Sequence, residues 1–190
     1  MTPSSVISAE VPVEWNVLVT ASMRKERSLL RFLREYGDFK GSGFRDVIIG
    51  AVENRDAFLE TLESLRREHP GSVRHLSQIV PLEKTFQFDV SDFREKLKEA
   101  LAPYVEELES ECRFYLRVKR RGHKGELSSH EIEQEMSAFI VDALEKAGKK
   151  TQIKFEDPDK LIIVETIGNR AGVGLITREM RERYPFIRVK

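Results

Sequence analysis

The chain has 190 residues, of which 40% are hydrophobic and 34% charged, with a formal net charge of zero at pH 7. These values are typical of a soluble globular protein with one large domain or two small ones, and the charge taken alone argues against a nucleic-acid binder. No apolar run approaches the roughly 20 residues that cross a bilayer, no secretory signal begins the chain, and the single cysteine, Cys112, excludes an internal disulfide, so we expect a cytoplasmic protein without a membrane partner.

The first half of the chain shows apolar patterns that alternate between strand and helix. They fall at Trp15–Thr20 (strand), Glu26–Tyr36 (helix), Val47–Val52 (strand), Asp56–Glu68 (helix) and Val73–Phe88 (one or two strands). This order predicts a ferredoxin-like domain over residues 14–88, preceded by an N-terminal tail at 1–13.

The second half of the chain predicts another α/β unit, over residues 89–190. A helix is expected from about Ser91 to Glu109, with a break at Pro103, and Ser128 with Glu131 forms a capping box for another helix that ends near Ala147. The predicted strands are Arg113–Lys119, Thr151–Phe155, Leu161–Thr166 and Ala171–Ile176, with a short last helix after Thr177. The fold class is therefore α/β, of the α+β kind.

A basic strand and loop are the strongest local feature. Between Arg113 and Lys124 there are six basic residues and no acid. Alternation places Arg117 and Lys119 on the polar side of the strand, and the loop that follows adds Arg120, Arg121, His123 and Lys124. Arginine side chains suit phosphate geometry, so these residues are candidates for RNA binding. The other interpretation is a solvated basic face without a ligand.

The same loop leads to an expectation about stability. Because Arg120 and Arg121 are expected in an exposed loop, changing both to alanine should alter the free energy of unfolding by no more than about 0.5 kcal/mol.

Two further segments could extend an RNA track. A glycine-rich loop after residue 165 offers Asn169 and Arg170, and we expect it on the same surface as Arg117. Its alternative interpretation is a hairpin whose small residues permit close packing. Arg24 and Lys25, between the first strand and the first helix, form a further candidate contact or simply a soluble start of that helix.

The sequence offers no convincing catalytic or metal site. Cys112, His123 and His130 are too few and too irregularly spaced for a structural zinc site, and Cys112 has no persuasive histidine partner as a nucleophile. The chain has no glycine-rich phosphate loop followed by lysine, and Gly172-Val173-Gly174 lacks the third glycine of a dinucleotide fingerprint. We therefore expect a protein that is not an enzyme and has neither cofactor nor metal.

Residues 117–122, Arg-Val-Lys-Arg-Arg-Gly, followed by 128–133, Ser-Ser-His-Glu-Ile-Glu, resemble THUMP domains. The stretch 155–159, Phe-Glu-Asp-Pro-Asp, then 163–165, and Ile167-Gly168 leading through Gly172 to 177–179, continue the resemblance. It covers about Val90 to Lys190, which makes 89–190 the expected THUMP domain. A ferredoxin-like domain usually precedes THUMP domains, in agreement with the pattern of residues 14–88.

The resemblance implies tRNA binding, in several relatives through the acceptor end. THUMP domains usually deliver tRNA to an attached modifying domain, but the sequence lacks an Asn-Pro-Pro-Tyr-type methyltransferase motif and a Ser-Gly-Gly-type adenylating loop. The chain is therefore most similar to stand-alone THUMP proteins, whose eukaryotic members act as adaptors for a tRNA cytidine acetyltransferase. The expected partners are tRNA and a tRNA-modifying enzyme. A protein-interaction module without RNA and an enzyme with an unrecognised site remain the alternatives.

Overall fold

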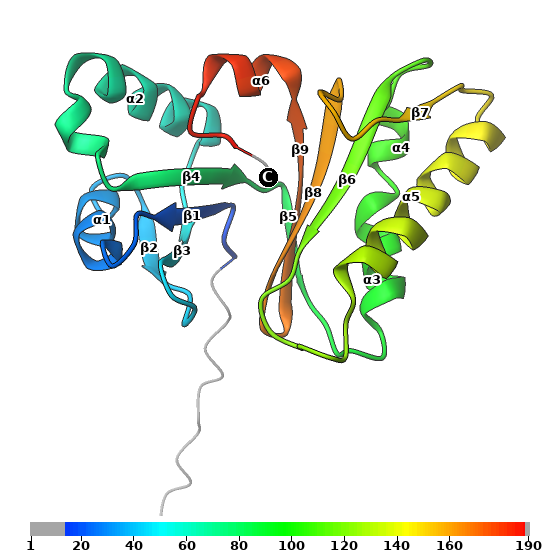
Figure 1. Cartoon of the computed structure of the whole chain (residues 1–190), viewed down its shortest axis with the longest axis horizontal. Helices are drawn as coiled ribbons and strands as arrows, with labels where there is room; N and C mark the ends of the chain where they lie inside the picture. Colours follow the sequence, from blue (N-terminus) through cyan, green and yellow to red (C-terminus); the bar gives the residue numbers. More distant parts are fainter. Residues whose placement is uncertain (1–13, 189–190) are drawn as a thin grey trace, which may run out of the picture.

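The computed structural model describes residues 14–188, so the predicted tail at 1–13 lies outside the described residues. Two α/β units lie side by side, each with a sheet and its own helices (Figure 1). The α+β fold class predicted from the sequence is confirmed.

The first unit is a four-stranded antiparallel sheet in the order β2-β3-β1-β4, with two long helices between its strands. Its elements are β1 Val17–Ala21, α1 Glu26–Leu33, β2 Asp38–Gly41, β3 Val47–Ala51, α2 Arg55–Glu68, a 3₁₀ turn Pro70–Val73 and β4 Leu76–Pro81. This order is that of the predicted ferredoxin-like unit. Strand β2 was not predicted, because it has one buried residue, Phe39, among exposed neighbours and ends in a glycine.

The second unit has a five-stranded mixed sheet in the order β5-β9-β8-β6-β7. Its elements are β5 Lys84–Gln87, α3 Phe93–Leu101, α4 Tyr104–Glu107, β6 Arg113–Lys119, α5 Ser129–Lys146, β7 Gln152–Ile153, β8 Lys160–Ile167, β9 Arg170–Thr177 and α6 Arg178–Arg183. Pro103 separates α3 from α4 as predicted, and the Ser128 hydroxyl caps α5 by accepting from the Glu131 N–H.

Strand β5 joins the second sheet, although the sequence analysis placed its residues in the first unit. It pairs with β9, with Thr85 opposite Gly172. A strand's partner lies far away in the sequence, so local patterns near residue 88 could not show which sheet receives β5. The segment 84–87 is thus part of the second sheet, while the division of the chain at residue 88 remains a prediction.

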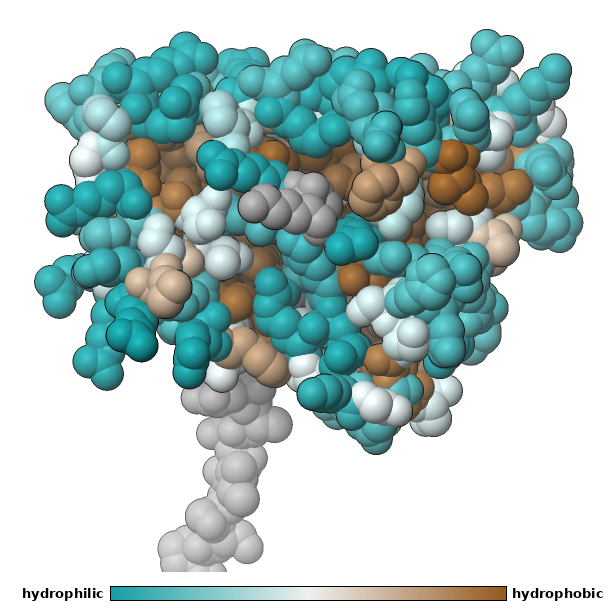
Figure 2. All heavy atoms as spheres, viewed as in Figure 1, coloured by the Kyte–Doolittle hydropathy of each residue, from teal (hydrophilic) through white to brown (hydrophobic). Residues whose placement is uncertain are grey.

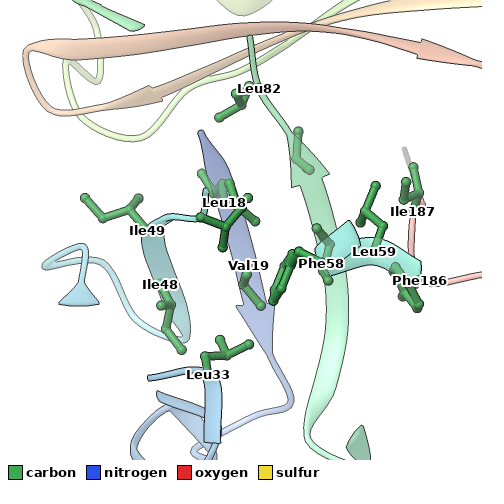
Figure 3. Packing of buried hydrophobic residues seen from close by; sticks show 14 of the residues in the cluster. Leu18, Val19, Leu33, Ile48, Ile49, Phe58, Leu59, Leu82, Phe186 and Ile187 are labelled. Atoms are coloured by element: carbon green, nitrogen blue, oxygen red, sulfur yellow. The ribbon is translucent and has the colours of Figure 1, made fainter. Parts of the chain in front are cut away.

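One face of the second sheet packs on its helices, and the other meets the first unit. Leu161 and Ile163 of β8 belong to the same apolar core as the residues of the first sheet. The C-terminal segment closes this junction, where the Ile79 N–H of β4 donates to the Phe186 carbonyl at 2.9 Å. Figure 3 shows Phe186 and Ile187 beside Leu59 of α2. The face of the second sheet opposite α3, α4 and α5 is therefore only partly open, because the first unit and the C-terminal segment with α6 cover part of it.

Glycine at position 174 is required at this junction, which gives a testable expectation. A Cβ atom on Gly174 would lie 2.4 Å from the Pro81 carbonyl oxygen, and backbone cannot rotate away. We expect Gly174→Ala to lower the free energy of unfolding by about 1–3 kcal/mol, which corresponds to a melting temperature lower by about 2–12 °C. Gly71→Ala is the matched control, because nothing lies within 4 Å of its Cβ position. Equal melting temperatures for the Gly174 variant and the parent would contradict the close packing.

Candidate nucleic-acid interface

The predicted basic strand and Arg170 of the predicted glycine-rich loop share one face of the second sheet. Along β6, Phe114, Leu116 and Val118 are buried against the helices, so Arg117 and Lys119 point to the opposite face. Lys119 is paired in register with Glu165 of β8, and Ile167 of the same strand is paired with Arg170 of β9. Because paired residues project to the same side of a sheet, Arg170 lies on the face of Arg117. The structure therefore places them as expected, while their role in binding RNA remains a prediction.

The basic loop and the glycine-rich turn pack directly on each other. The Gly168 N–H donates to the Arg121 carbonyl at 2.9 Å, and a Cβ atom on Gly122 would lie 3.1 Å from the Gly168 Cα. Both glycines have positive φ angles, 99° and 55°, which L side chains adopt only with strain. A closely packed hairpin was the alternative interpretation of the glycine-rich loop after residue 165. The structure contains that hairpin, and it also places the loop on the surface of Arg117.

Arg121 is not an exposed loop residue. Its guanidinium forms an ion pair with the Glu165 carboxylate, which is fully buried, and its own side chain is 20% exposed. Its backbone N–H also donates to the Thr166 hydroxyl at 2.9 Å. The premise that Arg121 is an exposed loop residue is therefore wrong, and we now expect its substitution to lower stability. The alternation along β6 could not show that the chain stays beside β8 after Lys119.

The Glu165 carboxylate is an unusual group for a sheet interior. Burial raises its pKa, while Arg121 and, more weakly, Lys119 act in the opposite direction. One of its two oxygens, Oε1, has no hydrogen-bond partner among the described residues. A buried carboxylate needs its cation, because an unpaired buried charge is strongly destabilising. Arg121 is thus committed to the interior of the protein.

His123 and Asn169 join the same two segments. The His123 Nε2 atom lies 2.9 Å from the Asn169 Oδ1 atom, and Nδ1 lies 3.1 Å from a carboxylate oxygen of Glu126. The ring also packs against Phe88, with centroids 5.6 Å apart. Both ring nitrogens are engaged, so His123 holds the loop to the β8–β9 turn and is a less available RNA contact than the sequence suggested.

Arg120 and Lys124 are the cations of the loop that do not pair with Glu165. Lys124 is exposed, and Arg120 is half-buried with a hydrogen bond from its guanidinium to the Gly122 carbonyl. On the strand, Arg117 is half-buried, with its Nη1 atom 3.8 Å from a Glu133 oxygen. The Lys119 Nζ atom donates to the Gln78 side chain of β4 at 3.4 Å, so the basic face of β6 contacts the first unit.

Arg24 and Lys25 are not brought to this surface. They follow the end of β1, whereas the chain just before β1 adjoins the second unit, since a Cβ atom on Gly172 of β9 would lie 3.0 Å from the Trp15 ring. Figure 1 shows α1, which begins next to them, at the side of the molecule away from the second sheet. The Arg24 N–H donates to an Asp46 carboxylate oxygen at 3.0 Å, which agrees with an ordinary turn.

The C-terminal helix adds arginines that the sequence analysis did not select. Arg181 of α6 lines a pocket of about 180 Å³ with Arg117, Tyr115 and Phe155. The Phe155 side chain is 67% exposed and meets Tyr115 edge to face at 5.1 Å. Arginines spaced by three residues in α6 were the available signal, but nothing in the sequence showed that this helix lies beside β6.

The face drawn in Figure 2 is mostly hydrophilic, with several hydrophobic patches between the hydrophilic side chains. Acids balance part of the basic charge of α6, since Arg178 pairs with Asp157 and Asp159 at 3.0 and 3.1 Å. The Arg113 guanidinium holds the pKa of Asp159 far below its usual range. Among residues 14–188, no group of three or more His, Cys, Asp or Glu residues could hold a metal ion, and no described helix is long and apolar enough to span a membrane.

A comparison with protein families identifies part of the chain. The THUMP domain family matches residues 88–175, from just after β5 to within β9. The chain therefore contains a THUMP domain in its second unit, as the sequence motifs indicated. No curated protein matches the sequence significantly.

Solved structures share the fold across both units. PH1313 from Pyrococcus horikoshii is 15% identical, with a TM-score of 0.58 over 86% of this chain and 55% of that one. TrmN from Thermus thermophilus is 17% identical, with a TM-score of 0.55 over 85% and 44%. A 4-thiouridine synthetase solved with RNA and ATP is 18% identical, with a TM-score of 0.54 over 86% and 41%. At these identities the likeness shows the fold alone, and this chain spans about half the length of those chains or less.

Proposed function

We propose that this protein binds tRNA without catalysing a reaction, through the face of the THUMP sheet opposite helices α3, α4 and α5. The observation that carries the proposal is the placement of Arg117, Lys119 and Arg170 on one face, beside the basic loop. Support also comes from the THUMP domain and from the similar fold of a 4-thiouridine synthetase that was solved with RNA. Arginine and lysine at such a surface position an RNA backbone through its phosphates.

The opposite side of the THUMP domain is unsuited to RNA. Helices α3, α4 and α5 together carry nine carboxylates and four cationic side chains. Charges on one face are screened from the other within about 8–10 Å, so the zero net charge of the chain does not prevent local RNA binding. The near-neutral overall charge nevertheless favours modest affinity, which a protein partner would strengthen.

We further propose that the protein acts as an adaptor. In this role the protein presents tRNA to a separate modifying enzyme, such as a cytidine acetyltransferase, and the support is the resemblance to stand-alone THUMP proteins. The cytoplasm is the proposed location, supported by a single cysteine, Cys112, that is unpaired and buried. The other candidate functions receive no specific support from the described residues.

The proposal is tested by titrating the protein with total tRNA and with an unrelated RNA of equal length. We expect tRNA to bind about tenfold more tightly or better, because recognition of RNA shape adds to the phosphate contacts that both RNAs offer. Fluorescence anisotropy at constant salt is a suitable measurement. Equal affinities would reduce the proposal to general RNA binding, and no binding to either RNA would favour a protein-interaction module.

A further inference from the structure

We infer that Glu165 and Arg121 form a positioning device for the RNA-binding loop, and that Arg121 is not itself a ligand of RNA. The inference rests on the proposed tRNA binding, but it reassigns one of the cations that the basic motif contributes. The device comprises the buried ion pair between these two side chains and the hydrogen bonds that Arg121 makes with Thr166 and Gly168. We refer to it as the clasp.

The clasp fixes Arg121 at three points. The side chain is held by Glu165, the backbone N–H by the Thr166 hydroxyl at 2.9 Å, and the carbonyl by the Gly168 N–H at 2.9 Å. All three partners lie at the end of β8 or in the turn that follows it. These contacts hold the first residues of the basic loop against the β8–β9 hairpin.

The neighbours of Arg121 gain from this attachment. Arg120 precedes it and is half-buried, with its guanidinium donating to the Gly122 carbonyl, and His123 reaches across the same hairpin to Asn169. A loop that is already ordered loses less conformational entropy when RNA binds. The buried Glu165 carboxylate therefore contributes to RNA binding by ordering the loop, although no RNA can reach it.

Electrostatics and positioning predict opposite results when the Glu165 charge is removed. Glu165→Gln deletes a negative charge from the RNA face, and charge alone would tighten the binding of a polyanion. Loss of the clasp would weaken binding, because RNA must then order the loop. We expect Glu165→Gln to bind tRNA about 3- to 10-fold more weakly than the parent, with the same dependence on salt.

The matched control is Glu156→Gln, which makes the same change of charge. Glu156 is exposed, lies between Phe155 and Asp157 of the pocket that also contains Arg117, and makes no hydrogen bond or ion pair with the described residues. We expect this variant to bind tRNA as tightly as the parent or slightly more tightly. If Glu165→Gln also binds as tightly or more tightly, with a steeper salt dependence, then Glu165 only neutralises Arg121 and the inference is overturned.

A second variant and a second readout make the test independent of folding and of the proposed function. Thr166→Val removes one point of the clasp without changing charge, and we expect a smaller loss of affinity in the same direction. Amide hydrogen exchange at Gly168 should accelerate in both variants, whether or not RNA binds. Unchanged exchange, or parent-like affinity of Thr166→Val, would overturn the clasp. If the parent binds no tRNA while Gly168 exchange accelerates in the variants, the proposed function fails and the clasp stands.

Discussion

Arg121→Ala is expected to lower the free energy of unfolding by about 3–5 kcal/mol, because it leaves the buried Glu165 carboxylate without its cation. Glu165 is fully buried on β8, and its Oε1 atom already lacks a partner among the described residues. Urea denaturation of the parent and the variant at pH 7 measures the difference.

Lys124→Ala is the control for the loss of one basic side chain from the same loop. Lys124 is exposed, so its removal should change the free energy of unfolding by no more than about 0.5 kcal/mol. Similar decreases in the free energy of unfolding for Lys124→Ala and Arg121→Ala would show that the buried ion pair adds no stability beyond that of an exposed lysine.

The cost of removing Arg121 should also depend on pH. Burial raises the pKa of Glu165 in the folded protein, so below that pKa the folded state holds a proton that the unfolded state releases at its ordinary value. The stability that this group contributes therefore falls as pH rises from the unfolded-state pKa to the raised folded-state pKa, and it recovers as pH falls. Arg121 lowers the pKa of Glu165, so removing Arg121 raises that pKa and widens the pH range over which stability falls. The deficit of Arg121→Ala should shrink between pH 7 and pH 5, and an equal deficit at both would contradict the assignment to Glu165.

Binding of tRNA to the parent protein should depend steeply on salt. If three to five phosphates are neutralised, a fourfold rise in salt weakens binding by about 20- to 500-fold, from a log–log slope of about 0.7–0.9 per contact. The cations available for these contacts are Arg117, Lys119, Arg120, Lys124 and Arg170. Anisotropy titrations at several salt concentrations give the slope directly. A slope near zero would mean that phosphates do not contribute, and the basic face would then be a solvated surface only.

Elements with long periodic patterns could be predicted from the sequence. The strand Arg113–Lys119, the break at Pro103 and the capped start of α5 all follow from local spacing or from one residue's chemistry. Strand β2 and the sheet that receives β5 could not be predicted in this way, since their identity depends on pairing with residues that are distant in the sequence.

The candidate site shows the same division. Alternation correctly placed Arg117 and Lys119 on one face, and the glycine-rich loop lies on the same surface as expected, but its packing on the basic loop was not predicted. Pairing of Arg121 with Glu165 was not visible, because a basic residue in a glycine-rich loop has the same local pattern whether it faces water or a buried acid. The separation of Arg24 from the other cations was hidden for a similar reason, since it depends on how the two units are joined.

The most direct test of tRNA binding through this face compares the salt dependence of the parent with that of an Arg120→Ala, Lys124→Ala double variant. These two cations lie on the loop and are not held by Glu165, so both should contact phosphates. We expect weaker tRNA binding and a log–log slope flatter by about 1.4–1.8, the value for two contacts. Lys146→Ala on the acidic helix side should match the parent. A double variant that binds tRNA with the parent's affinity and slope across the salt series would contradict the account.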